Sequence, residues 1–193
     1  MVGILLAAGF SRRFGATDKL LQLLPDGRPI AVASAESLIQ GVPDCIAVLR
    51  PENKVLAELL SDRGFKLVFC AENSQEMADS LVTAVRFSAQ FLASNDGFVI
   101  ALADMPYIKP NSIQTIAGQL TKGASIVIPT YLGQHGHPVG FAAKFRNDLE
   151  NLQGDEGARS IIKRYPNEVA LLACEDKAIL ADIDIPADLN QVI

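Results

Sequence analysis

The sequence MVGILLAAGFSRRFGATDK, residues 1–19, decides the fold class of this chain. It opens with an apolar run, residues 2–8, which is typical of a buried parallel strand. Gly9 ends the run, and a small, basic segment without side-chain periodicity follows it. Glycine lets a ligand approach the backbone closely, while arginine and lysine provide positive charge for phosphate oxygens. A strand that runs directly into such a loop predicts a nucleotide-phosphate site in an α/β fold.

The composition indicates an ordered chain with little excess charge. The chain has 193 residues, of which 49% are hydrophobic, and a formal net charge of −5. These values predict one domain over residues 1–193 and provide no basic field for nucleic acid. No apolar run approaches the roughly 20 residues of a membrane span, and the first run is too short for a signal segment. Three widely spaced cysteines beside apolar runs predict buried thiols in a reducing compartment, so we expect a cytoplasmic protein.

Strand and helix patterns alternate from residue 2 to about residue 129. Strands are expected at residues 2–8, 44–49, 65–70, 97–103 and 125–129, and helices at 29–40, 52–62, 80–93 and 110–120. This alternation predicts a Rossmann-like, open, mostly parallel sheet with helices on both faces. Later strands are expected to add a mixed β edge, at residues 139–142, 168–173 and 178–183.

Asp104 directly follows the most hydrophobic predicted strand, residues 97–103, and precedes Met105 and Pro106. A carboxylate fixed at a strand end can hold Mg²⁺, which one or two carboxylates usually bind together with substrate phosphates. An aspartate in this position can equally cap a turn or a helix. Because ligand loops lie at the carboxyl ends of parallel strands, we expect Asp104 to share a site with the basic loop at residues 9–19.

Motifs along nearly the whole chain resemble those of the molybdenum-cofactor cytidylyltransferases and related molybdopterin nucleotidyltransferases. The first loop resembles the signature L-A-A-G-x-S-x-R-x-G…K at Leu6, Ala7, Ala8, Gly9, Ser11, Arg13, Gly15 and Lys19. ALADMP, residues 101–106, resembles the motif L-x-D-M/Q-P, in which the aspartate binds the metal. The resemblance implies the nucleotidyltransferase fold, a nucleotide site on the first loop, and Mg²⁺ at Asp104. It also implies that three residues are catalytic, namely Arg13, Lys19 and Asp104.

Residues 182–189, DIDIPADL, resemble the segment D-I-D-T-P-x-D-L near the end of these enzymes, with Ile185 in place of threonine. The resemblance implies Asp184 as a second metal ligand, with Asp182 as the alternative. A surface turn that Asp188 caps explains the same residues without a metal.

Residues 71–81, AENSQEMADSL, resemble the base-binding loop N-x-x-x-x-G-M-x-x-S-L of the same enzymes. The resemblance implies that Asn73 and Ser80 bind the nucleotide. Glu76 stands where glycine is usual, and a side chain there hinders close approach of a base. Ser80 is equally suited to cap the helix that follows it.

Two late, glycine-rich motifs resemble the acceptor side of these enzymes: GHPVGF, residues 136–141, and GDEGAR, residues 154–159. The resemblance implies four acceptor-binding residues, His137, Pro138, Asp155 and Arg159. An ordinary loop histidine and a solvated helix arginine are the alternatives for His137 and Arg159. By this interpretation residues to about 130 bind nucleotide and metal, and residues from about 131 to 193 bind the acceptor.

The expected activity is transfer of a nucleoside monophosphate from an NTP to a phosphorylated small molecule, with release of pyrophosphate. Ala8, in place of glycine, resembles the cytidylyl members more than the guanylyl members, and a methyl group there would crowd the base pocket, so the resemblance implies CTP over GTP. The resemblance implies molybdopterin as acceptor and a molybdoenzyme or chaperone as protein partner. GTP and a sugar or isoprenoid phosphate are the alternative substrates, and a noncatalytic nucleotide-binding regulatory module is the alternative class. An NAD-type oxidoreductase would need a glycine fingerprint that the first loop lacks.

Overall fold

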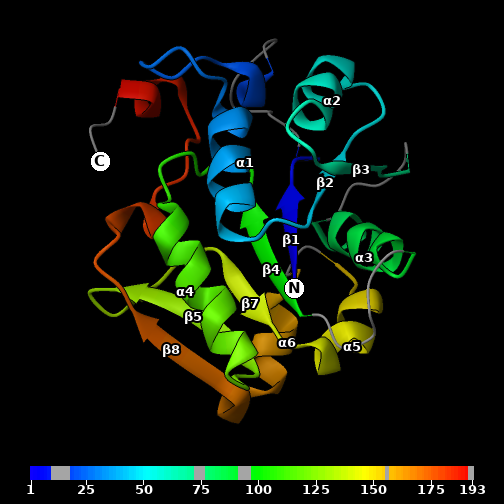
Figure 1. The fold of residues 1–193 in the computed structure, drawn as a ribbon, viewed down its shortest axis with the longest axis vertical. Helices are drawn as coiled ribbons and strands as arrows, with labels where there is room; N and C mark the ends of the chain where they lie inside the picture. Colours follow the sequence, from blue (N-terminus) through cyan, green and yellow to red (C-terminus); the bar gives the residue numbers. More distant parts are fainter. Residues whose placement is uncertain (10–17, 72–76, 91–96, 155–156, 191–193) are drawn as a thin grey trace.

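The computed structural model describes residues 1–9, 18–71, 77–90, 97–154 and 157–190. Within these ranges one mixed, eight-stranded sheet runs through the molecule in the order β3-β2-β1-β4-β7-β5-β6, and β8 pairs with β5 (Figure 1). The strands are β1 (Val2–Leu6), β2 (Cys45–Leu49), β3 (Lys66–Phe69), β4 (Phe98–Leu102), β5 (Ile126–Tyr131), β6 (Gln134–His135), β7 (Val139–Phe141) and β8 (Val169–Ala173).

The first four strands of the order are parallel, and the sheet becomes mixed beyond β4. Strand β7 runs antiparallel to both of its neighbours, β4 and β5, whereas β8 runs parallel to β5. The predicted open, mostly parallel sheet with a mixed side is therefore confirmed. The antiparallel strand β7 lies inside the sheet, and β8 provides the outer strand.

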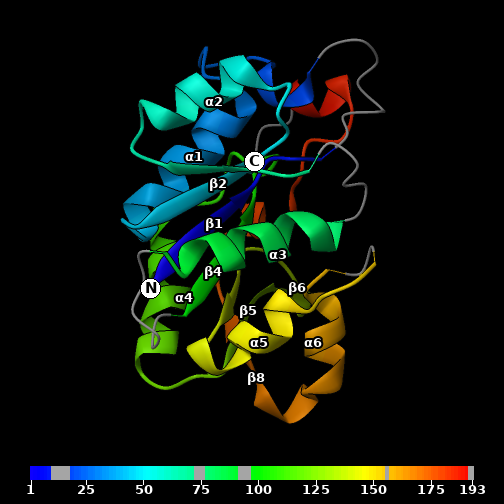
Figure 2. The ribbon, with the colours of Figure 1, turned by 90° about the vertical axis from the view of Figure 1, so that its right-hand side faces the viewer.

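Helices cover both faces of the sheet (Figure 2). They are α1 (Ile30–Gly41), α2 (Lys54–Ser61), α3 (Met77–Ser88), α4 (Pro110–Thr121), α5 (Arg146–Glu150) and α6 (Arg159–Arg164). One apolar core joins the sheet to α1, α2 and α4, and a second joins it to α3, α5 and α6. Neighbouring strand residues divide between them, because Ile4 belongs to the second core and Leu5 to the first. None of the helices in the described ranges combines the length and apolar character needed to cross a membrane.

The predicted strand at residues 178–183 is wrong. The chain forms a 3-10 turn there, η5 (Lys177–Leu180), which begins where the Asp176 carboxylate accepts a hydrogen bond from the Ala178 N–H at 3.2 Å. Ala178 and Ile179 are buried, so their apolar character comes from core packing and not from a strand. Short apolar runs do not distinguish these two states.

The cysteines are free thiols, and two of the three are buried as predicted, Cys45 and Cys70. Cys174 is partly exposed, because it follows the outer strand β8.

Candidate active site

Two adjacent parallel strands, β1 and β4, deliver the first candidate residues to one edge of the sheet. Their pairing continues beyond the strands, since the Ala103 N–H donates to the Leu6 carbonyl at 3.1 Å. The segments that begin at Gly9 and Asp104 therefore start side by side. A Cβ added at Gly9 would meet no atom of the described residues within 4 Å.

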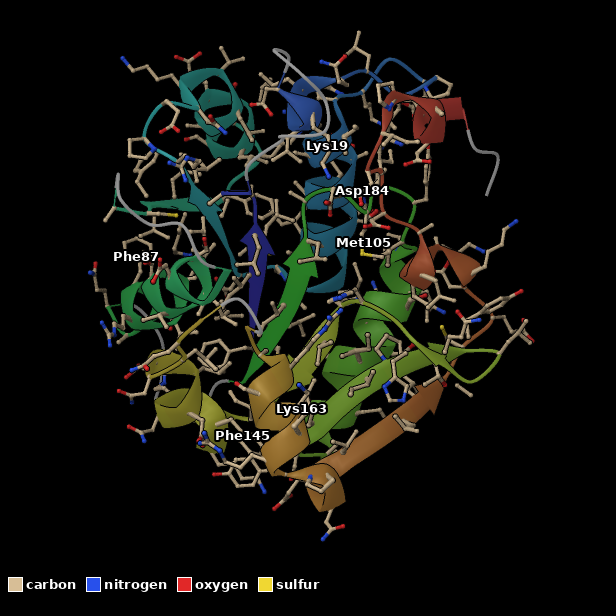
Figure 3. The ribbon with its side chains drawn as sticks, turned by 180° about the vertical axis from the view of Figure 1, so that it is seen from behind. Lys19, Phe87, Met105, Phe145, Lys163 and Asp184 are labelled. Carbon is tan, nitrogen blue, oxygen red and sulfur yellow. The ribbon has the colours of Figure 1, made fainter. Side chains whose placement is uncertain are left out.

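Lys19 reaches this edge from a short 3-10 turn, η2 (Lys19–Leu21). Asp18 starts the turn by accepting a hydrogen bond from the Leu20 N–H at 3.0 Å, and the Leu20 side chain is buried. The Lys19 Nζ atom lies 2.8 Å from Asp104 Oδ2 and 3.5 Å from Asp184 Oδ1. Figure 3 shows Lys19 and Asp184 near each other, with Met105, the residue after Asp104, just beyond them. One ammonium group thus bridges two carboxylates from distant parts of the chain.

The backbone at Asp104 is fixed by two hydrogen bonds. Its carbonyl accepts a hydrogen bond from the Ile183 N–H at 2.9 Å, and the preceding carbonyl, of Ala103, accepts one from the Ser34 hydroxyl at 2.9 Å. Asp104 Oδ1 is buried and has no hydrogen-bond partner among the described residues. A buried carboxylate oxygen normally has a partner, so this atom is suited to a ligand from outside the protein.

Three carboxylates gather here, because oxygens of Asp104, Asp182 and Asp184 lie within 4.8 Å of one another. Asp182 is exposed, yet partial desolvation raises its pKa; a backbone hydrogen bond and the charge of Lys19 lower that pKa, and the charges of Asp184 and Asp104 raise it. Lys19 alone does not balance three negative charges. Oxygen ligands, excess negative charge and the unpartnered Asp104 Oδ1 together fit a hard divalent cation such as Mg²⁺. Both residues that the sequence suggests as the second metal ligand, Asp182 and Asp184, therefore lie at this site.

The GHP motif lies against η5. The Gly136 backbone packs so closely there that a Cβ would come within 2.5 Å of the Ile179 carbonyl oxygen. That carbonyl also accepts a hydrogen bond from the His137 N–H at 2.9 Å, and Pro138 is buried. His137 Nδ1 is buried and lacks a hydrogen-bond partner among the described residues. The motif is thus rigidly placed, with one polar atom left for a ligand.

The charges around His137 connect the metal side to the GDEGAR motif. Burial lowers the pKa of His137, the charge of Arg159 lowers it further, and the charge of Asp104 opposes both. The imidazole is therefore neutral at neutral pH. Arg159 begins α6 and is exposed.

Four of the predicted residues lie outside the described part of the chain: Ser11, Arg13, Asn73 and Asp155. Ala7 and Ala8 are 1% and 7% exposed and belong to the two apolar cores on opposite faces of the sheet, and Leu6 is partly buried. A nucleotide would therefore contact these three residues mainly through their backbone atoms. The buried methyl group of Ala8 also weakens the steric argument for a pyrimidine.

Ser80 does not cap its helix. The helix α3 begins at Met77, so Ser80 lies inside it, and its Oγ atom is buried 3.6 Å from the Cys70 sulfur. Sequence reasoning also missed Ser34, which fixes the strand end before Asp104. A polar residue inside the buried run of α1, IAVASAE, was the available signal.

Comparison with known proteins gives one family match and several similar proteins. The family model described as the MobA-like NTP transferase domain matches residues 3–169. The chain is similar to the purine catabolism protein PucB of Bacillus subtilis (strain 168), with 26% identity over 100% of this chain and 95% of that protein. It is equally similar to the nicotine blue oxidoreductase of Paenarthrobacter nicotinovorans, with 26% identity over 100% and 96%. A probable molybdenum cofactor guanylyltransferase of Thermococcus kodakarensis is 30% identical over 78% of this chain and 70% of that protein.

A solved structure has the same fold. Rv0371c from Mycobacterium tuberculosis H37Rv, in complex with manganese, matches 97% of this chain and 94% of its own with a TM-score of 0.78 and 24% identity.

Proposed function

The chain belongs to the MobA-like NTP transferase domain family, and we propose that it is a Mg²⁺-dependent cytidylyltransferase that moves CMP from CTP to molybdopterin and releases pyrophosphate. One observation carries the proposal: Lys19 Nζ lies between Asp104 Oδ2 and Asp184 Oδ1, while Asp104 Oδ1 has no partner among the described residues. A cation-binding carboxylate pair beside a lysine at the strand ends suits a nucleoside triphosphate.

The chain's own residues would divide the work. Asp104 and Asp184, with Asp182 beside them, would hold the metal, which when bound supplies positive charge to the transferring phosphoryl group. Lys19 would turn from the carboxylates to the triphosphate and neutralise the leaving pyrophosphate, and Arg13 would assist it. The similar protein Rv0371c has been solved in complex with manganese, which is consistent with a divalent metal here.

The acceptor side needs no general base, because a phosphate acceptor is already a nucleophile and the transfer relies on its position. Neutral His137 would offer a hydrogen bond to the polar ring of molybdopterin, since its Nδ1 atom is buried without a partner among the described residues. Arg159 would donate two parallel hydrogen bonds from its guanidinium to the acceptor phosphate, as a bidentate pair. With Pro138 and Asp155 these residues make the proposed acceptor site.

GTP is the second candidate nucleotide. The relative named as a probable guanylyltransferase is 30% identical to this chain, and the buried Ala8 methyl group gives no clear steric preference. A thermal-shift panel of the four NTPs with Mg²⁺ decides between them, because a ligand at 100 times its dissociation constant stabilises by about 2.7 kcal/mol. The largest shift is expected with CTP. A larger shift with GTP would reassign the nucleotide, and no shift with any NTP would refute the nucleotide site.

The other activities are tested separately. Pyrophosphate release on mixing NTP, Mg²⁺ and acceptor would distinguish an enzyme from a noncatalytic nucleotide-binding module. One relative is named an oxidoreductase, so an NADH-binding titration belongs beside the panel, and no binding is expected. Sugar and isoprenoid phosphates, tried in place of molybdopterin, test the acceptor.

A further inference from the structure

The segment that carries Asp184 is anchored on its N-terminal side by Ile183. The Ile183 N–H donates to the Asp104 carbonyl at 2.9 Å, and its side chain is 2% exposed. That side chain packs in a small apolar cluster with Leu24, Ile30 and Ala33. The residue before Asp184 is therefore fixed both to the metal side and to α1.

On the C-terminal side the anchor is Asp188. Its Oδ2 atom accepts hydrogen bonds from the Asp184 N–H at 2.9 Å and from the Ile185 N–H at 3.0 Å. Asp188 belongs to the 3-10 turn η6 (Pro186–Asn190), so its carboxylate binds the backbone of the two residues that precede the turn. Hydrogen bonds from backbone N–H groups to a carboxylate are stronger than those between neutral groups.

The Asp184 side chain is less enclosed than that of Asp104. It is 43% exposed, and its contact with Lys19 is 3.5 Å long, compared with 2.8 Å for Asp104. The direction of its carboxylate depends in part on the backbone at residue 184, which Ile183 fixes on one side and Asp188 on the other.

We propose that Asp188 is a positioning residue for the metal site: by binding the Asp184 N–H it holds the Asp184 carboxylate within reach of Asp104. Asp188 acts through Asp184 and is not one of the three acids whose oxygens gather within 4.8 Å. The inference rests on the proposed function in one respect, namely that these acids bind a divalent cation. Residues that orient a metal ligand typically change metal affinity by about 10- to 100-fold when they are replaced.

The experiment measures Mn²⁺ affinity without nucleotide, from the electron paramagnetic resonance signal of free Mn²⁺. Asp188→Ala is expected to weaken binding about tenfold or more. Asp188→Asn keeps an oxygen that can accept the same hydrogen bonds, and it should restore most of the affinity. Asp188→Glu keeps the charge but displaces the oxygen, so it should bind Mn²⁺ less tightly than the wild type.

Asp26→Ala is the matched control. Asp26 also accepts a backbone hydrogen bond, from the Arg28 N–H at 3.0 Å, but in an exposed turn that is not part of the carboxylate cluster. Its replacement should leave Mn²⁺ affinity unchanged, whatever it does to thermal stability. If Asp26→Ala weakened Mn²⁺ binding as much as Asp188→Ala does, the loss of any turn would explain the effect, and Asp188 would have no positioning role.

Asp184→Ala separates failure of this inference from failure of the proposed function. If Asp184→Ala weakens Mn²⁺ binding but Asp188→Ala and Asp188→Glu do not, Asp188 has no positioning role and the metal assignment stands. If Asp184→Ala binds Mn²⁺ as the wild type does, the metal assignment of Asp184 fails, and the role of Asp188 fails with it.

Discussion

Asp104 and His137 each have one buried polar atom without a hydrogen-bond partner among the described residues, but their electrostatic surroundings are opposite. Asp104 belongs to a cluster of carboxylates that Lys19 neutralises only in part. His137 is kept neutral by burial and by the charge of Arg159. One side of the site is thus suited to a cation and the phosphates it accompanies, and the other to hydrogen bonds with a polar acceptor.

Asp104→Ala should have the largest effect. Removing the carboxylate removes the charge that would hold the metal, so kcat should fall by about 10³-fold or more while the circular dichroism spectrum stays unchanged. Asp148→Ala is the matched control, because Asp148 is also a mostly buried carboxylate with a basic partner, Arg164 at 3.0 Å. Full activity of Asp104→Ala would remove Asp104 from the catalytic site.

Lys19→Met should affect metal and nucleotide in opposite directions. Without nucleotide, Mn²⁺ should bind a few-fold to about tenfold more tightly, because a competing positive charge at 2.8 Å has been removed. With nucleotide, kcat/KM should fall by about 10²-fold, because the pyrophosphate loses a charged partner. Lys144→Met, which breaks another 2.8 Å ion pair, with Glu168, should change neither. Weaker Mn²⁺ binding in Lys19→Met would contradict the proposed exchange of partners.

The sequence predicts that Gly9 and Asp104 lie together better than it predicts that Asp184 joins them. Strand patterns place Gly9 and Asp104 at neighbouring strand ends, because parallel strands share one carboxyl edge. Nothing local in the sequence places Asp184 beside Lys19, since 165 positions separate them and the contact depends on the path of the chain after β8. Asp184 belongs to the part assigned to the acceptor, yet it contacts the lysine of the nucleotide part.

On the proposed acceptor side, the motifs indicate candidate residues but not their electrostatic state. Whether His137 is charged depends on burial against η5 and on Arg159, and neither is visible in a local pattern. The predicted strand at residues 178–183 fails for a similar reason, because a cap from Asp176 redirects an apolar run into a turn.

Arg159→Ala should act on the acceptor alone. Loss of the guanidinium should raise the acceptor KM by about tenfold, because a charge-assisted hydrogen bond contributes roughly 1.5–3 kcal/mol, with CTP affinity nearly unchanged. Arg164→Ala, at the other end of α6, is the control and should behave as the wild type. An equal loss of CTP affinity in Arg159→Ala would assign the arginine to the nucleotide side.

The smallest effect concerns His137 and pH. Its pKa lies below the ordinary value of 6.5 in the folded chain, so well above pH 6.5 the imidazole is neutral in both the folded and the unfolded chain and contributes no pH dependence. Below that pH the unfolded chain takes up the proton first, and the free energy of unfolding falls until the folded pKa is passed. Urea unfolding at about pH 7.5 and 5.5 should show a larger loss for the wild type than for His137→Asn. His135→Asn, at an exposed histidine, is the control and should lose as much free energy of unfolding as the wild type does between these two pH values. If His137→Asn also lost as much as the wild type, His137 would not be kept neutral.

The most informative experiment measures nucleotide transfer itself. CTP, Mg²⁺ and molybdopterin are mixed with the wild type or with Asp104→Ala, and both pyrophosphate release and the mass of the acceptor are measured. We expect the wild type to release one pyrophosphate for each acceptor that gains CMP, and Asp104→Ala to do neither. Equal transfer by both proteins, or binding of CTP by the wild type without pyrophosphate release for any phosphorylated acceptor, would contradict the proposed function.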